Sequence, residues 1–345
     1  MTHIERFYNT VNRKKTDRPA WWLGIPVEAS HNELFKYFKV SNINELKQAI
    51  NDDIWDVSLP YDLKNKGLLC EALNFTKPEY INEAKKGSSL TLPGFFEDYE
   101  DADAIDLFNW PNPEQFINKE DCLNSIKSVP KDYPIMAVMW EANFQDACSA
   151  FGMEKSLMNM MLNPEFFEAV LSKITDFYMR ANEIYFEYLK GKLDVVLIGN
   201  DLGTQISTIA SPNIIREMVF PNIKKLVTQI KSYDIKVLFH SCGSIFELIP
   251  DLIEIGVDII NPLQAKAKNM QIDNIKRSFY GKVSFCGGVD AQDILVTGTP
   301  EDVYKEVIRI KEIFPTGLII SPSHEAILPD ISPANIEALM RGVVD

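Results

Sequence analysis

The sequence lacks long hydrophobic runs and basic clusters, and these absences limit what the protein can be. No apolar stretch approaches the ~20 residues that a membrane-spanning helix needs, and residues 1–16 are polar and charged where a signal peptide has an apolar core. The 345 residues carry a formal net charge of −14, and no Lys/Arg cluster interrupts that balance. The sequence therefore predicts a cytoplasmic protein with no membrane anchor and no nucleic-acid partner.

Cysteine is also scarce, and the five cysteines form no closely spaced disulfide framework. A large cytoplasmic chain keeps its thiols reduced, so we expect core thiols or metal ligands here. Cys70, Cys122 and Cys148 fall in apolar or helical stretches and are expected to be small core hydrophobes. Cys242 and Cys286 instead follow strand-like runs.

No Gly-rich dinucleotide or phosphate loop follows any strand-like run, which removes the main support for an open doubly wound sheet. Eight short apolar runs alternate with helical patterns, at residues 20–24, 54–58, 135–139, 195–198, 237–239, 257–260, 283–285 and 318–320. Helix starts are marked by a capping residue before proline at 163–164, 211–212, 299–300 and 332–333. These patterns predict an α/β fold, a (β/α)8 TIM barrel with an insertion between strands 2 and 3, formed by residues 1–345 as one domain.

The segment 60–133 is the least regular part of the chain. It contains the acidic run 97–106 and a helical pattern at 113–126. A long irregular segment in a compact fold is typically a lid or a binding loop, so we expect it at the mouth of the barrel. The acidic run is expected to be a solvated face rather than a metal site.

The stretch around His240 is the most informative part of the sequence. An apolar, β-branched run at 237–239 stops at His240, and Cys242 follows one residue later. Residues just past the carboxyl end of a parallel strand face the ligand crevice. Imidazole and thiolate side chains at that edge can converge on one Zn²⁺ ion. A buried structural His–Cys pair is the alternative interpretation.

A zinc site that performs chemistry needs about three protein ligands and one open position. His324, which follows the last strand-like run, is the preferred third ligand, and Cys286 is the competing one or a thiol of the pocket wall. Asp201 and Glu141 also follow strand-like runs and are candidate catalytic residues. Each of these two could instead hydrogen-bond a ligating histidine or cap a turn.

Six further residues are expected at the same mouth and are candidate substrate-binding groups. They are Trp22, Tyr61, Trp140, Asn200, Gln205 and Gln264. Aromatic side chains at strand ends suit an apolar or aromatic ligand, but they are also common in barrel cores.

Several segments together resemble the uroporphyrinogen decarboxylase superfamily, and within it the cobamide-dependent methyltransferases. The matching segments are residues 239–243, 256–258, 261–264, 287–290, 298–303, 321–324 and 333–336. The resemblance covers residue 134 to the end well and the first third only loosely. It implies a TIM barrel, a zinc ion held by His240, Cys242 and a later ligand, and a corrinoid carried by a separate protein.

The sequence departs from both branches of this superfamily. The decarboxylases carry an arginine-rich segment after the first strand, whereas residues 21–26 contain no arginine, so a polyanionic substrate would lack counter-charges. Thiol-methylating members carry a cysteine where this chain has His324, which argues against a standard coenzyme M methylase. Decarboxylases use no metal and also carry a histidine near that position.

The leading hypothesis is therefore a zinc-dependent methyltransferase that moves a methyl group between a small methylated compound and the corrinoid protein. A methoxyaromatic that undergoes O-demethylation suits the aromatic rim. One alternative is a metal-free, decarboxylase-like lyase in which Asp201 and His324 handle protons. The other is a non-catalytic ligand-binding barrel. The sequence leaves the methyl donor, the direction of transfer and the formation of a homodimer open.

Overall fold

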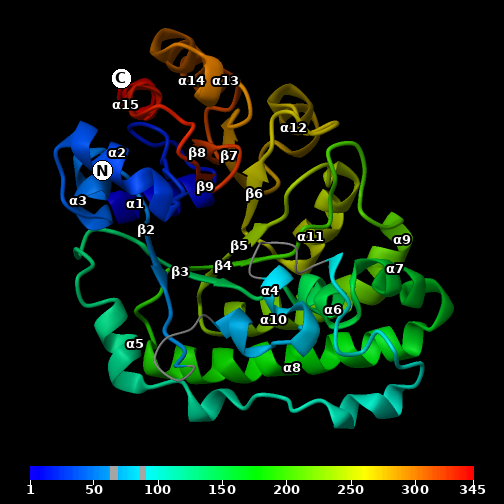
Figure 1. Ribbon diagram of the computed structural model, residues 1–345. Coiled ribbons are helices and arrows are strands. Elements are labelled where there is room, and N and C mark those ends of the chain that lie inside the picture. The colour runs from blue at the N-terminus through cyan, green and yellow to red at the C-terminus, as the bar shows by residue number, and fades with distance from the viewer. Residues whose placement is uncertain (63–68, 85–90) are drawn as a thin grey trace.

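The computed structural model describes residues 1–62, 69–84 and 91–345, and its centre is a curled parallel sheet (Figure 1). The sheet has the order β2-β3-β4-β5-β6-β7-β8, and neighbouring strands pair in parallel. The strands are β2 (Trp55–Ser58), β3 (Ile135–Trp140), β4 (Val195–Gly199), β5 (Lys236–His240), β6 (Ile259–Leu263), β7 (Ser284–Val289) and β8 (Leu318–Pro322). The predicted TIM-barrel fold is confirmed, and seven of the eight strands lie where the sequence predicts them.

The first predicted strand, residues 20–24, is present only as an isolated parallel bridge between Trp21 and Ile320 of β8. The N–H of Trp22 donates to the carbonyl of Ile320 over 3.0 Å, and the N–H of Ile320 donates to the carbonyl of Ala20 over 2.9 Å. This segment therefore lies at the free edge of β8 and occupies the place of the first strand.

On its other edge the same segment is held by carboxylates. The N–H of Trp21 donates to Asp53 over 3.0 Å, and the N–H of Leu23 donates to Asp52 over 3.1 Å. One backbone hydrogen bond, from the Asp53 N–H to the Trp21 carbonyl, joins this segment to the residues that precede β2. Side-chain acceptors here replace the carbonyls of a regular ladder, which explains why the first strand is incomplete although its apolar pattern is correct.

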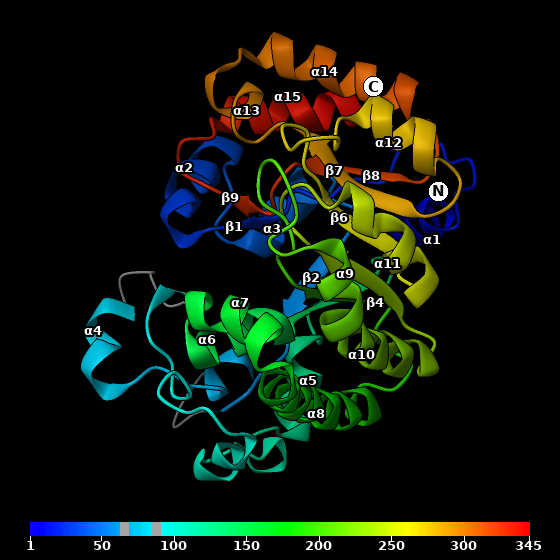
Figure 2. The same ribbon diagram turned by 90° about the vertical axis from the view of Figure 1, so that its right-hand side faces the viewer.

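Helices cover the outside of the sheet, with α14 and α15 on one side and α8 and α10 on the other (Figure 2). The main helices are α1 (His3–Val11), α2 (Glu28–Phe38), α3 (Ile43–Ala49), α6 (Asn143–Phe151), α7 (Met153–Leu162), α8 (Pro164–Tyr188), α10 (Phe220–Ser232), α11 (Ile249–Ile255), α12 (Ile272–Phe279), α14 (Pro300–Ile313) and α15 (Pro333–Val344). Within the described ranges, no helix is both long enough and apolar enough to cross a membrane.

Three of the four predicted helix starts are genuine N-caps. The hydroxyls of Ser211, Thr299 and Ser332 each accept a backbone N–H from the first turn of the helix that follows. Asn163 precedes Pro164 but makes no side-chain cap bond, and its amide instead donates to the carbonyl of Glu100. The proline at the first helical position therefore marked all four starts correctly.

The barrel interior is filled by inward-facing side chains rather than being hollow. It contains Ala20, Trp22, Ile54, Met136, Val138, Val195, Leu197, Leu238, Ile259, Cys286 and Ile319. Phe7 and Val11 of α1 join this cluster, and α1 is bonded to β7 through the Ser284 hydroxyl, which donates to the Val11 carbonyl. Since Ser284 begins β7, α1 covers the amino-terminal end of the barrel, which leaves the carboxyl end for a ligand.

The insertion between β2 and β3 is built mainly from short helical pieces in its described parts. These are η1 (Leu69–Ala72), η2 (Pro78–Tyr80), α4 (Ile81–Ala84), η4 (Ala102–Leu107), η5 (Pro113–Gln115) and α5 (Lys119–Ser125). The predicted helix at 113–126 is two pieces, because Asn118 interrupts it and caps α5. Residues 63–68 and 85–90 of the predicted segment 60–133 lie outside the described residues, and its role as a lid stays a prediction.

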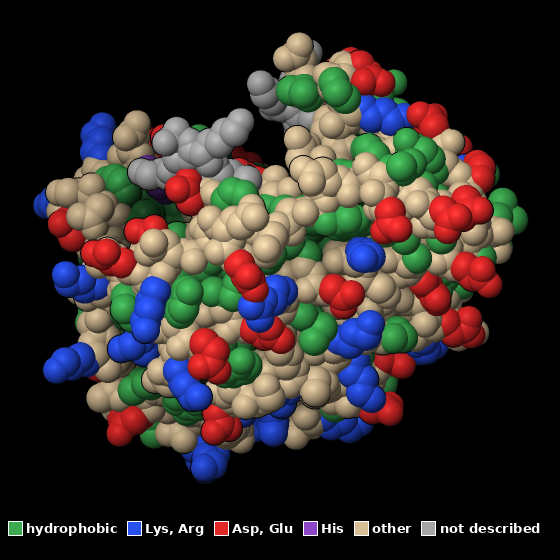
Figure 3. All heavy atoms as spheres, turned by 90° about the horizontal axis from the view of Figure 1, so that it is seen from below, with side chains coloured by type: hydrophobic (Ala, Val, Ile, Leu, Met, Phe, Trp, Pro, Cys, Tyr) green, Lys and Arg blue, Asp and Glu red, His purple; other side chains and the backbone are tan. Residues whose placement is uncertain are grey.

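The acidic run in this insertion pairs with lysines at the surface. Lys77 contacts Glu97 at 3.1 Å and Asp98 at 2.7 Å, and Lys155 contacts Glu100 at 2.5 Å. The face of the molecule in Figure 3 carries acidic, basic and apolar side chains side by side. That face offers no continuous basic surface for a phosphate backbone.

Asp53 is the centre of a buried ion-pair network beneath the first strand. Its carboxylate is fully buried and lies 2.6 Å from Arg6, 2.5 Å from Arg18 and 2.7 Å from His3. Burial raises the pKa of Asp53, but the His3 hydrogen bond and the charges of Arg18 and Arg6 bring it below its usual value. The ionised carboxylate therefore stabilises the closure of the barrel.

We expect Asp53→Ala to reduce the free energy of unfolding by about 3 kcal/mol, because the two arginines lose their buried counter-charge. Urea denaturation at pH 7 measures this, and the exposed Asp176→Ala is expected to change stability by less than about 0.5 kcal/mol. The pKa of Asp53 is lower in the folded chain than in the unfolded chain, where it is ~3.9. The ionised carboxylate therefore stabilises the fold above that pH, and this stability is lost as the pH falls through the folded pKa. The substituted chain is therefore expected to lose less stability than the original below about pH 4, and equal losses would contradict the network's role.

Candidate metal centre

His240 is the last residue of β5 and points toward the barrel axis. It is paired with Gly199 of β4 and Asn261 of β6. A Cβ atom at Gly199 would lie 2.6 Å from the Cβ atom of His240 and 2.8 Å from its carbonyl oxygen, so glycine on the neighbouring strand permits the close approach of the two strands beside His240. His240 is 5 % exposed and lies at the carboxyl end of the barrel, where the sequence predicted it.

Three side chains bring nitrogen, sulfur and oxygen donors together at this point. Asp201, His240 and Cys242 each offer one ligand atom, and these atoms lie within 4.8 Å of one another. Nε2 of His240 is 3.3 Å from Sγ of Cys242 and 3.4 Å from Oδ1 of Asp201. Oδ1 also accepts the backbone N–H of Cys242 over 2.8 Å, which fixes the loop after β5 against the loop after β4.

The charges in this cluster favour a cation. Burial lowers the pKa of His240, but the Glu325 carboxylate and the hydrogen bonds with Asp201 and Cys242 raise it well above its usual range. Burial raises the pKa of Cys242, whereas hydrogen bonds with His240 and His324 bring it below its usual value. The ring therefore attracts a positive charge at Nε2, and a divalent ion can take the place of the proton there.

His324, the predicted third ligand, lies across the mouth after β8. Its side chain is 45 % exposed, and its ring stands edge-on to that of His240 with centroids 6.5 Å apart. Its Nδ1 accepts the N–H of Ala326, and a hydrogen bond with Cys242 raises the pKa of His324. The described cluster of three donors contains Asp201, which follows β4, the strand next to β5. Ligation by His324 stays a prediction.

Cys286, the competing ligand, is a fully buried residue of β7 in the barrel interior. Burial raises the pKa of its thiol to about 12, and it is not among the clustered donors. Cys286 thus lies in the barrel core, and both of its expected roles, third ligand and thiol of the pocket wall, stay predictions. Cys122 and Cys148 are buried free thiols, as predicted, whereas the side chain of Cys70 lies outside the described part of the chain.

Trp140 and Glu141 are adjacent at the end of β3, but their side chains lie in different surroundings. Both have left-handed backbone conformations, with φ of 62° and 49°. The Trp140 ring stands edge-on to His240 with centroids 5.3 Å apart. Glu141 is fully buried, Asn182 of α8 faces its carboxyl, and neither carboxyl oxygen has a hydrogen-bond partner among the described residues. The structure thus brings Trp140, and not Glu141, to the donor cluster.

The two other predicted aromatic substrate residues lie in the core. Trp22 is fully buried in the barrel interior, and its indole N–H donates to Asp56 over 2.9 Å. Tyr61 is 1 % exposed and packs against Phe116 and Phe177. Each side chain is enclosed by protein, and a role of either one in substrate binding stays a prediction.

The three predicted polar substrate residues have different surroundings. Asn200 is buried and accepts the N–H of Phe144, so it holds the start of α6. Gln264 accepts the N–H of Gly243 over 2.5 Å and thereby holds the loop that carries Cys242. Gln205 is exposed in the loop after β4 and remains available to a ligand. The first two therefore act on the site through the backbone.

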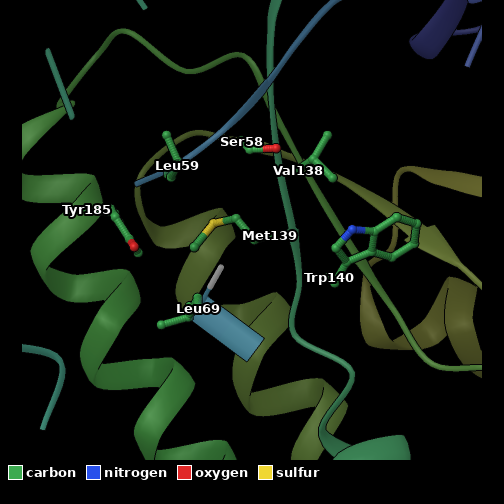
Figure 4. Close-up of a pocket in the computed structure, with 7 residues that line it drawn as sticks. All are labelled: Ser58, Leu59, Leu69, Val138, Met139, Trp140 and Tyr185. Carbon is green, nitrogen blue, oxygen red and sulfur yellow. The ribbon is translucent and has the colours of Figure 1, made fainter. Parts of the chain in front are cut away.

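A small cavity of about 30 Å³ lies beside the end of β3 (Figure 4). Its lining residues are Ser58, Leu59, Leu69, Val138, Met139, Trp140 and Tyr185. The wall is mainly apolar, and the Tyr185 hydroxyl donates to the carbonyl of Pro60 over 2.8 Å. Trp140 is thus the residue that the cavity lining and the surroundings of His240 share.

Glu325 is a residue of the site that the sequence reasoning missed. It is 7 % exposed, and its carboxyl lies 3.2 Å from Nδ1 of His240. Oδ1 of Asn261 lies 2.9 Å from the same nitrogen. The sequence signal that could have found Glu325 is an acidic residue directly beside His324 at a strand end.

The fold and these contacts define a TIM-barrel protein with a candidate divalent-cation centre at the carboxyl ends of β4 and β5. The family model described as Uroporphyrinogen decarboxylase (URO-D) matches residues 85–344, which is most of the chain. The chain therefore belongs to the uroporphyrinogen decarboxylase family, as the motif resemblance predicted.

Two individual proteins are similar to this chain. A solved methyltransferase from Methanosarcina mazei matches with a TM-score of 0.70 and 15% identity, over 100% of this chain and 98% of that chain, which shows a shared fold. The light-independent protochlorophyllide reductase subunit N of Prochlorococcus marinus (strain NATL2A) is 26% identical over 125 residues, which are 35% of this chain and 30% of that protein. The chain thus matches under a third of that protein's length.

Proposed function

We propose that the chain is a zinc-dependent methyltransferase that moves a methyl group between a small methylated compound and a corrinoid carried by a separate protein. The observation that carries this proposal is the convergence of Asp201, His240 and Cys242 at the barrel mouth. Membership of the uroporphyrinogen decarboxylase family and a fold shared with a methyltransferase support it.

The residues present fit a zinc ion. Thiolate, imidazole and carboxylate are all zinc ligands, and three protein ligands leave a position for the substrate. The Asp201 side chain is 43 % exposed, so the cluster is open on the side of the mouth. When bound, zinc supplies Lewis-acid chemistry by polarising the atom that carries the methyl group.

The protein's own residues orient the substrate and shield it from water. The Trp140 ring stands edge-on to His240 at the barrel mouth, and an aromatic side chain beside the donor cluster suits the ring of a methoxylated aromatic compound. Residues 21–26 are buried or partly buried and contain no arginine, which disfavours a polyanionic porphyrinogen substrate. We therefore propose O-demethylation of a methoxyaromatic as the reaction class.

A metal-free lyase is the second candidate. Asp201 and His324, with side chains 43 % and 45 % exposed, are titratable groups open to the mouth and could exchange protons with a bound substrate. This candidate needs no cation between His240 and Cys242. The two functions therefore differ in metal content.

We expect protein purified without chelator and supplied with Zn²⁺ to retain about one equivalent, and to transfer methyl groups from a panel of methoxyaromatics to cob(I)alamin. The same protein after chelation is expected to lose transfer and regain it with Zn²⁺. Metal analysis and cobalamin absorbance are the measurements. Folded protein with less than about a tenth of an equivalent would overturn the metal centre and favour the lyase. Methyl transfer that is unchanged after full chelation would overturn the zinc dependence.

A further inference from the structure

We propose that Glu325 is a positioning residue that holds the His240 imidazole with Nε2 directed at the bound cation. This inference rests on the metal centre proposed above. It concerns the side of the ring that faces away from Asp201 and Cys242.

The two ring nitrogens of His240 have different neighbours. Nε2 faces Sγ of Cys242 and Oδ1 of Asp201, whereas Nδ1 faces Oδ1 of Asn261 at 2.9 Å and Oε2 of Glu325 at 3.2 Å. Oδ1 of Asn261 is the hydrogen-bond partner of Nδ1, and Oε2 of Glu325 makes an ion-pair contact without a hydrogen bond of its own in the described residues. With a cation at Nε2, Nδ1 is the nitrogen that carries the hydrogen. The lone pair of the neutral ring is then on Nε2, which is the form that binds a metal ion.

Glu325 forms ion-pair contacts only with histidines in the described part of the chain. Its carboxyl is nearly buried, and its charged neighbours within 4.0 Å there are the imidazoles of His240 and His324, with no lysine or arginine among them. A buried carboxylate without such a partner destabilises a fold. The nearer imidazole, that of His240, is therefore the group that stabilises this carboxylate and that the carboxylate holds in place.

The amino-terminal segment fixes Glu325 in this position. β1 (Ile25–Pro26) pairs in parallel with β9 (Ala326–Ile327), and the N–H of Ile25 donates to the carbonyl of Glu325 over 2.6 Å. Gly24 has a φ of 95°, and a Cβ atom there would lie 2.3 Å from the Glu325 carbonyl oxygen. Only glycine permits this close approach of the two segments.

The first test is Co²⁺ binding by the full chain, measured by chelator competition and by absorbance. We expect Glu325→Gln to weaken Co²⁺ binding about 10-fold, because the amide keeps an acceptor but loses the charge, and Glu325→Ala to weaken it up to about 100-fold. The thiolate charge-transfer band is expected to persist, since Cys242 is intact, while the ligand-field bands change as the imidazole reorients. Glu312→Gln removes an exposed acid on α14 and is the control for net charge.

The second test moves Glu325 without substituting it. Gly24→Ala is expected to weaken Co²⁺ binding to a similar extent as Glu325→Ala, although residue 24 is not a ligand. Gly281→Ala is the matched control, because Gly281 also has a positive φ of 78° but has no heavy atom within 4 Å of the position of a Cβ. It bears the same kind of backbone strain and is expected to bind Co²⁺ normally.

The outcomes separate this inference from the proposed function. Glu325→Ala protein that binds Co²⁺ within about twofold of the unsubstituted chain, with the same spectrum, overturns the positioning role and leaves the metal centre intact. An equal loss in Glu312→Gln also overturns it, since charge alone would then suffice. An unsubstituted chain that binds neither Zn²⁺ nor Co²⁺ overturns both.

Discussion

Cys242→Ala is expected to lose bound zinc and to lower methyl transfer at least about 10³-fold. Cys242 supplies the softest donor of the cluster, and its removal leaves an imidazole and a partly exposed carboxylate. Loss of a Lewis acid worth several kcal/mol corresponds to about three orders of magnitude in rate. Metal analysis and single-turnover transfer to cob(I)alamin measure the two effects, and His240→Ala is expected to behave in the same way.

Cys286→Ala is the matched control for this prediction. It removes the other thiol near the barrel axis, which is fully buried and outside the donor cluster. We expect it to retain zinc and transfer, with a stability loss of about 1 kcal/mol for the small cavity. Zinc loss in Cys286→Ala together with zinc retention in Cys242→Ala would reverse the ligand assignment.

Zinc content after substitution of Asp201 or of His324 identifies the third ligand. We expect Asp201→Ala to lose zinc and His324→Ala to keep most of it, because Asp201 lies in the compact donor cluster and His324 does not. The contact of His324 with Cys242 keeps it close to the substrate position. The opposite result would restore the ligand set that the sequence alone predicts.

The sequence was most informative where local pattern and global fold agree. Buried parallel strands are short, continuous apolar runs, so seven strands and the turns that follow them were predictable. The first strand was not, because Asp52 and Asp53 supply acceptors that a periodicity argument cannot see. Placement at strand ends was enough to bring Asp201, His240 and Cys242 to one point.

The parts of the site that sequence reasoning missed depend on backbone detail. A non-glycine left-handed turn at Trp140 and Glu141 has no sequence signal, yet it decides which of the two side chains reaches His240. Glu325 becomes part of the site only through the short β1–β9 pairing, which two residues on each strand form. Both features are long-range consequences of barrel closure and not of local propensity.

Glu141→Gln is expected to leave the protein about as stable as the original at pH 5 and to make it more stable at pH 8. Burial raises the pKa of Glu141 to about 8, whereas an unfolded glutamate titrates near 4.3. Between these values the unfolded state ionises and the folded state does not, so stability is lost as pH rises. The loss approaches about 5 kcal/mol by pH 8 in the original chain. Glutamine cannot ionise and avoids it.

Urea denaturation of both proteins from pH 5 to pH 8 measures this difference, and the exposed Glu168→Gln on α8 is the control that leaves the slope unchanged. Parallel stability curves for the original chain and Glu141→Gln would contradict a buried neutral carboxyl. The same variant also tests the predicted catalytic role of Glu141. Because its carboxyl faces Asn182 and not the donor cluster, we expect zinc content and methyl transfer to be retained, so that a large loss of transfer with normal zinc would assign Glu141 to the chemistry after all.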